Sequence, residues 1–150
     1  MSNYIFDLIG KICIPLIIGY VTFIIAKKQI VNAGVTQFRQ KWIDNLRDSI
    51  SIFIAKAEMI SMLDFEDNEA YFIHFKELSQ MQYKVELMLN ASESDHKEIS
   101  TFMWEIRDLI HDEDINEKDL EFALDDTTEK LVNASKRVLK REWGVVKKGG

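Results

Sequence analysis

Residues able to do chemistry are few in this chain, and their spacing does not assemble a reactive site. The histidines His74, His96 and His111 lie far apart and lack the HxxxH or HExxH spacing that puts two imidazoles on one helix face. The sequence contains no glycine-rich phosphate loop and no nucleophile elbow. We therefore expect no catalytic residue, no cofactor and no metal ligand, and a protein that is not an enzyme.

The acidic turn at residues 112–116 begins like a calcium-binding loop, with oxygen-bearing side chains at every second position. Glu117 then stands where such a loop needs glycine, and Ala123 stands where it needs a bidentate glutamate. These two departures argue against calcium. The single cysteine, Cys13, provides neither a disulfide framework nor a thiol cluster for zinc.

The element that positions the rest of the chain is an apolar stretch near the N-terminus. Residues 12–26 carry no charge, and extension back to residue 4 supplies the length of about 20 residues that a helix needs to cross a bilayer. We expect a transmembrane helix whose interfacial anchors are aromatic and basic side chains, which suit the head-group level. These anchors are Tyr4, Lys11, Tyr20, Lys27 and Lys28.

Two other interpretations compete with the span. A cleaved signal peptide would fit the small residues before Gly34, but Asp7 and the Lys27–Lys28 pair are not typical of one. A buried core helix of a soluble domain is permitted by a run of only 15 residues. The dibasic stop directly after the run favours the membrane.

The basic residues predict the orientation of the span. Lys and Arg are more frequent after it than before it, which places the C-terminal side in the cytoplasm. We expect residues 1–30 to be an anchor in the inner membrane with the N-terminus outside, and residues 31–150 to be a cytoplasmic helical domain.

The net charge of −6 conceals a division along the chain. Residues 61–129 hold 20 acidic and 5 basic residues, whereas from Lys130 onward seven basic residues oppose Glu142 alone. So acidic a midsection is a poor partner for nucleic acid. The basic flanks suit an anionic membrane surface, although solvated helix faces would give the same pattern.

Downstream of the span, apolar residues recur at spacings of three and four in four segments, which predicts amphipathic helices. The first seam runs from Phe38 to Ile60, with Gly34 as the point where the chain breaks or bends after the span. The second covers about residues 69–89, the third carries apolar residues from Ile99 to Ile110 before a turn at residues 111–116, and the fourth carries them from Leu120 to Val138. Ser92 or Ser94 is the expected cap of the third segment and Asn116 that of the fourth.

Short connectors favour antiparallel neighbours. The predicted fold is all-α, an N-terminal transmembrane helix followed by an antiparallel helical bundle of about four amphipathic helices. The first seam could instead form a parallel coiled coil beneath the membrane. The expected core draws on residues from every segment: Trp42, Phe53, Phe75, Leu78, Val85, Phe102, Ile106, Leu109, Leu124, Leu131 and Val138.

Exposed Trp and Arg often anchor protein interfaces. The candidate partner contacts are Trp42, Arg47, Arg137, Arg141 and Trp143, although core packing is the simpler role for the two tryptophans.

The stretch from Phe38 to Arg47, together with Leu139 to Trp143 and the turn at residues 85–96, resembles a loose group of small bacterial membrane proteins. In that group one N-terminal span precedes an R-x-x-W-I-x-x-L-R helix. The resemblance implies this topology and a helical cytoplasmic domain, and no activity or functional residue.

We expect a single-pass membrane-anchored interaction or regulatory module whose partners are the lipid bilayer and either another protein or further copies of itself. The alternative is an oligomeric membrane effector that forms pores or disturbs the membrane, as in stress or phage defence. Gly19, Thr22 and the Asp7–Lys11 pair would then face the assembly, because polar groups in a span usually point inward.

Overall fold

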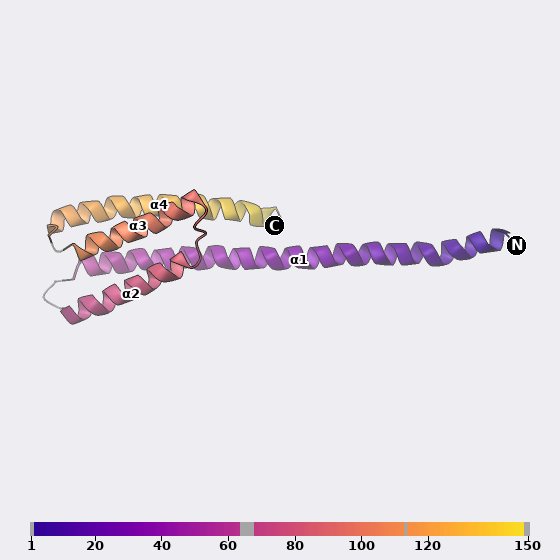
Figure 1. Ribbon diagram of the computed structural model, residues 1–150, viewed down its shortest axis with the longest axis horizontal. Coiled ribbons are helices and arrows are strands. Elements are labelled where there is room, and N and C mark those ends of the chain that lie inside the picture. The colour runs from indigo at the N-terminus through magenta and orange to yellow at the C-terminus, as the bar shows by residue number, and fades with distance from the viewer. Residues whose placement is uncertain (1, 64–67, 113, 149–150) are drawn as a thin grey trace.

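The computed structural model describes residues 2–63, 68–112 and 114–148, and the side chains of residues 11, 14–63, 69–112 and 114–148. The described residues form four helices and no strand: α1 (Ser2–Ser61), α2 (Asn68–Glu86), α3 (Ser94–His111) and α4 (Glu117–Lys147). The helices run alternately up and down, and the N-terminal half of α1 projects beyond the bundle (Figure 1). The prediction of an antiparallel helical bundle is confirmed. Residues 64–67 of the expected connector 64–68 and the Asp7 and Tyr4 side chains fall outside what is described, and Asn68 is the first residue of α2.

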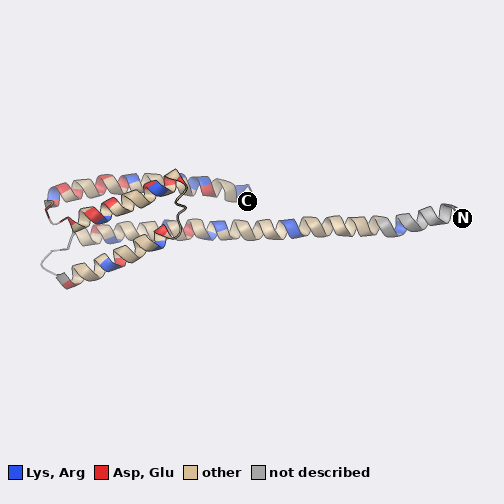
Figure 2. Ribbon diagram, viewed as in Figure 1, with Lys and Arg blue, Asp and Glu red and all other residues tan. Residues whose placement is uncertain are grey.

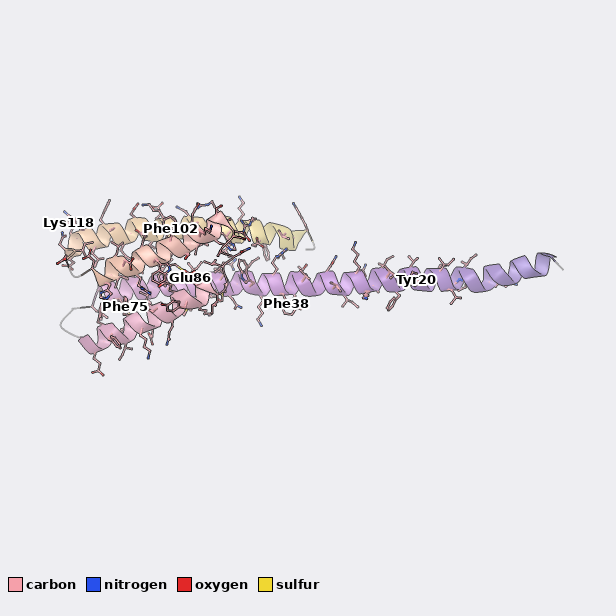
Figure 3. The ribbon with its side chains drawn as sticks, in the orientation of Figure 1. Tyr20, Phe38, Phe75, Glu86, Phe102 and Lys118 are labelled. Atoms are coloured by element: carbon pink, nitrogen blue, oxygen red, sulfur yellow. The ribbon has the colours of Figure 1, made fainter. Side chains whose placement is uncertain are left out.

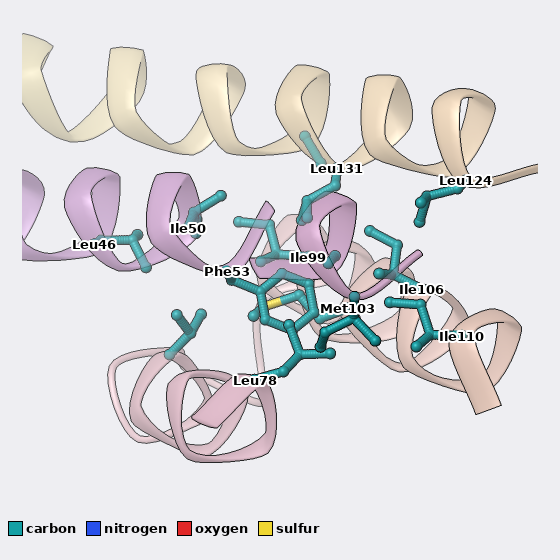
Figure 4. Packing of buried hydrophobic residues seen from close by; sticks show 14 of the residues in the cluster. Leu46, Ile50, Phe53, Leu78, Ile99, Met103, Ile106, Ile110, Leu124 and Leu131 are labelled. Atoms are coloured by element: carbon teal, nitrogen blue, oxygen red, sulfur yellow. The ribbon is translucent and has the colours of Figure 1, made fainter. Parts of the chain in front are cut away.

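The core lies where the C-terminal half of α1 meets the other three helices. Phe53 is fully buried at its centre, with Leu78 from α2, Ile106 from α3 and Leu131 from α4 around it (Figure 4). Each helix brings its apolar seam to this centre because burial of apolar side chains is the dominant favourable term in folding. The expected core residues are buried, except that Trp42, Phe75, Phe102 and Leu109 are half-buried at its edge.

Of the alternatives expected at Gly34, the break does not occur, because α1 passes through this residue without interruption. One helical glycine costs only about 1 kcal/mol relative to alanine, which the strongly helical segments on both sides can offset. The segment expected to span the membrane and the first amphipathic segment after it are therefore one helix.

The apolar seam of α1 also differs from the predicted seam at its start. Phe38 is 77% exposed and points away from the other helices (Figure 3). At this level the half-buried positions of α1 are Gly34, Thr36 and Arg39, and Arg39 pairs with Glu142 of α4 at 3.5 Å. The side of α1 that faces α4 here is thus a polar one, and Phe38 lies off it.

Of the two predicted helix caps, the one at α4 is confirmed and the one at α3 is wrong. Asn116 is the N-cap of α4, and its side chain accepts a hydrogen bond from the Asp119 N–H at 3.0 Å, as expected. At α3 the N-cap residue is Glu93, whose side chain makes no capping bond, so neither serine has the expected role. The Ser92 hydroxyl instead donates to the Asn90 side chain at 2.8 Å, within a turn that Asn90 organises.

Within the part of the chain that the structure describes, one helix is long and apolar enough to cross a membrane. This is α1 from Ile14 onward, and its most apolar window has none of its residues buried. Large apolar side chains such as Leu16, Tyr20 and Phe23 are exposed there, with no helix beside them (Figure 3).

Candidate functional site at the junction of α1, α3 and α4

The most extensive polar network in the structure lies where α3 begins beside the C-terminal half of α4. Arg141 of α4 reaches the N-terminal turn of α3, where it bonds the carboxylates of Glu93 and Asp95. Its Nε donates to Glu142 on its own helix at 3.0 Å. The hydrogen bond to Glu142 raises the pKa of Arg141, and the charges of Asp95 and Glu93 act in the same direction.

His96 is the buried centre of this network, with 5% of its surface exposed. Its Nδ1 accepts a hydrogen bond from the backbone N–H of Asn90 at 2.8 Å, and its Nε2 lies 3.3 Å from the Arg141 guanidinium. The imidazole also stacks on Trp42 of α1, with ring centroids 6.0 Å apart. The Trp42 Nε1 donates to the Met88 carbonyl at 3.1 Å. One imidazole thus fastens the α2–α3 turn to both α1 and α4.

Three side chains of this network, Glu93, Asp95 and His96, are of types that can bind a metal ion. One ligand atom each from Glu93, Asp95 and His96 lies within 4.8 Å of the others. The Arg141 guanidinium already bonds both carboxylates and approaches the imidazole. The cation that this cluster binds is therefore the Arg141 guanidinium of the same chain. Its hydrogen bonds hold α4 against the start of α3.

The structure brings together some of the contact residues expected from the sequence and separates others. Trp42 and Arg141 meet through His96, and Arg137, one turn earlier in α4, bonds Glu98 of α3. Arg47 is exposed and pairs with Asp44 at 3.1 Å, on the rim of an apolar groove of about 270 Å³ between α1 and α4. Trp143 is 39% exposed. Of the expected anchors with described side chains, Lys11, Tyr20, Lys27 and Lys28 are all exposed.

A second surface lies between α2 and α3 and was not predicted from the sequence. Tyr83 of α2 meets Trp104 of α3 edge to face, with centroids 6.5 Å apart. The Arg107 guanidinium lies 4.1 Å from the centre of the Trp104 ring, at a distance where a cation is attracted to the aromatic face. Leu87, at the end of α2, is 90% exposed. The i,i+3 spacing of Trp104 and Arg107 was visible in the sequence, but its pairing with Tyr83 depends on the register between helices.

No protein-family model matches the chain, and neither a curated protein nor a solved structure is detectably similar to it.

Proposed function

We propose that the chain is a non-catalytic, membrane-anchored interaction module that presents a helical bundle to a protein partner. The observation that carries this proposal is the continuity of α1. The same helix is exposed and apolar from Ile14 to Ile25 and contributes buried residues from Ile43 to Ile60. A water-soluble protein would leave this long apolar face in contact with water, at a cost of roughly 25 cal/mol per Å².

The proposed location is the inner membrane, with the bundle in the cytoplasm. Its support is the excess of basic residues after the apolar segment, which includes Lys27, Lys28 and Lys41. A cut at the small residues before Gly34 would fall within an uninterrupted helix, which supports an anchor over a removable leader.

The α2–α3 surface is the best-supported partner contact. Trp42 and Arg141 are occupied by bonds within the chain, whereas Tyr83 is 53% exposed beside Trp104 and Leu87. Trp, Tyr and Arg are the residues most enriched among energetic hot spots of interfaces. We assign the recruiting role to Tyr83, Trp104 and Arg107.

Co-purification tests this proposal. The tagged full-length protein is solubilised gently and compared with Trp104→Ala and with Phe122→Ala, which removes an exposed aromatic side chain from α4. We expect a stoichiometric foreign partner that is lost with Trp104→Ala and kept with Phe122→Ala. A pure homo-oligomer in all three preparations would contradict recruitment.

A second candidate function is the oligomeric membrane effector. The observation that favours it is an exposed apolar face beyond the segment proposed to span the bilayer, formed by Val31, Val35 and Phe38. Nothing lies within 4 Å of a Cβ built on Gly19, so a second helix has room to approach there. Overexpression toxicity that disappears with Gly19→Leu, and a complex that falls to a monomer without residues 1–34, would favour this function.

A further inference from the structure

A polar groove lies between α1 and the end of α4, just after the apolar segment. Lys148 lies beside α1 and borders, together with it, a shallow and open hollow of about 580 Å³. The lining of the groove carries amide, hydroxyl and ammonium groups and not one carboxylate. It consists of Gln29, Asn32, Ala33, Thr36, Gln37, Gln40 and Lys148. Amide and hydroxyl donors with one ammonium suit a phosphate group, whose oxygens accept hydrogen bonds and carry negative charge.

The groove begins at the depth of lipid head groups if residues 4–26 cross the bilayer. At about 1.5 Å of rise per residue, Gln29 lies about 4.5 Å and Asn32 about 9 Å beyond Ala26 along the helix. The head-group region extends roughly 5–8 Å on each side of the hydrocarbon core. Gln29, Asn32 and the flexible side chain of Lys148 therefore reach the level of the phosphates.

Cations without an internal partner gather at this end of the structure. In the described part of the chain, Lys27, Lys28, Lys147 and Lys148 make no ion pair. The basic residues deeper in α4 differ, because Arg137 and Arg141 bond carboxylates of α3. Acidic side chains are spread over α3 and α4 further from the C-terminus (Figure 2). The arginines of α4 thus have partners within the bundle, whereas these four lysines have no ion pair in the described residues. Lys136 and Lys140 also lack one, so what distinguishes the four is their place near the apolar segment and the groove.

We propose that this groove binds the head group of an anionic phospholipid from the surrounding bilayer. The proposal rests on the membrane anchoring put forward above. Lys147 and Lys148 supply the attraction to the phosphate, and Gln29 and Asn32 supply directed hydrogen bonds. The lipid would join the end of α4 to α1 at the membrane surface, where the two helices face each other across the groove.

Lipid titration of the full-length protein tests the proposal. The protein is first incorporated into phosphatidylcholine nanodiscs, and then, in mild detergent, its affinities for phosphatidylglycerol and phosphatidylcholine are measured by native mass spectrometry. Lys147→Gln/Lys148→Gln is compared with Lys136→Gln/Lys140→Gln, which removes two exposed lysines of the same helix that also lack an ion pair in the described structure. Gln29→Leu/Asn32→Leu removes the groove's hydrogen bonds at the head-group level at constant charge. Circular dichroism verifies that each variant remains helical.

We expect the wild type to prefer phosphatidylglycerol. Each lysine near an anionic surface contributes about a fivefold preference for the anionic lipid. Lys147→Gln/Lys148→Gln should therefore reduce the preference for phosphatidylglycerol up to about thirtyfold, and Lys136→Gln/Lys140→Gln should change it little. The groove variant should also weaken phosphatidylglycerol binding. Equal effects of both lysine pairs, or an unchanged groove variant, would overturn the site and leave only diffuse charge attraction.

The other outcomes separate this inference from the anchoring proposal. Incorporation into nanodiscs without preference for phosphatidylglycerol overturns the lipid site and leaves the anchor intact. Failure to incorporate overturns both. Binding of soluble glycerol 1-phosphate as tightly as phosphatidylglycerol would identify a free phosphate, and not a lipid, as the ligand.

Discussion

At the scale of single residues, Arg141 and His96 connect segments that are 45 to 48 residues apart in the chain. Hydrogen bonds that involve a charged group are roughly twice as strong as neutral ones, but part of this gain is lost where water reaches the pair. The Arg141 side chain is 41% exposed. We therefore expect its bonds to fix the register of α3 against α4 more than to raise the free energy of unfolding.

We predict that Arg141→Ala lowers the free energy of unfolding by about 1 kcal/mol, because it removes a partly exposed network and not a buried pair. The matched control is Lys140→Ala, which truncates the neighbouring exposed cation of α4. Urea denaturation followed by circular dichroism measures both. Equal destabilisation by the two changes would show that the Arg141 network is energetically neutral.

A second residue-scale prediction concerns Glu77. The hydrogen bond from Lys56, at 2.6 Å, and the charge of Lys56 hold the pKa of Glu77 below the ordinary glutamate value of 4.5. A carboxylate whose pKa is lowered in the folded state contributes stability above its unfolded pKa and loses it as the pH falls through the lowered value.

The stability gap between wild type and Glu77→Gln should therefore be at its largest above pH 4.5 and should narrow in more acidic solution. Denaturation midpoints measured from pH 7 to pH 3 check this trend. Glu121→Gln, at an exposed position of α4, serves as the control. A gap that stays constant down to pH 3 would contradict the linkage.

At the junction of α1, α3 and α4, the sequence pointed to Trp42 and Arg141 as separate candidates but not to the contacts that bring them together. Trp42 was expected from its spacing, and it packs at the edge of the core as the simpler interpretation held. His96 was not, because its burial depends on a turn that brings Asn90 back to its ring and on a helix end 45 residues away. Spacing along one helix contains no information about such contacts.

At the scale of elements, the continuity of α1 is the main departure from expectation. A glycine inside an amphipathic pattern weakens a helix without ending it when both flanks propagate well. The number of helices, their order and most of their buried faces followed from periodicity, since each seam is local. Cap identity at α3 did not, because Asn90 and Ser92 satisfy each other within the turn.

We predict that Gly34→Ala stabilises the exposed part of α1 by about 0.5–1 kcal/mol, because alanine loses less backbone entropy and a Cβ at this position meets nothing within 4 Å. Hydrogen exchange of the amides at residues 30–38 should slow by a few-fold. Gly144→Ala, the equivalent change near the end of α4, should leave those amides unchanged. Faster exchange in Gly34→Ala would reveal a close contact that needs the glycine.

At the scale of the whole molecule, the core is confined to one part of the chain. Every buried apolar side chain in the described residues lies between Ile43 and Val138. The N-terminal part of α1 therefore adds length and an apolar surface but no core contact.

We predict that a fragment starting at Val35 folds in water with the same helical bundle and a cooperative transition like that of the full-length protein. Circular dichroism and light scattering provide the test, and a chain of scrambled sequence and equal composition is the baseline. A fragment that is unfolded in water would indicate that the core needs residues 2–34.

If α1 crosses the bilayer as we propose, the thickness of the bilayer affects the orientation of the bundle directly. A span longer than the hydrocarbon core is wide responds by tilting. Because α1 is also the central helix of the core, a tilt of α1 would tilt the whole bundle with it. From Ala26 to Ser61 the helix extends about 50 Å, and a tilt of about 10° would carry its far end sideways by about 9 Å. A protein anchored in this way converts a change in its lipid surroundings into a displacement of its recognition surface, without any rearrangement inside the domain.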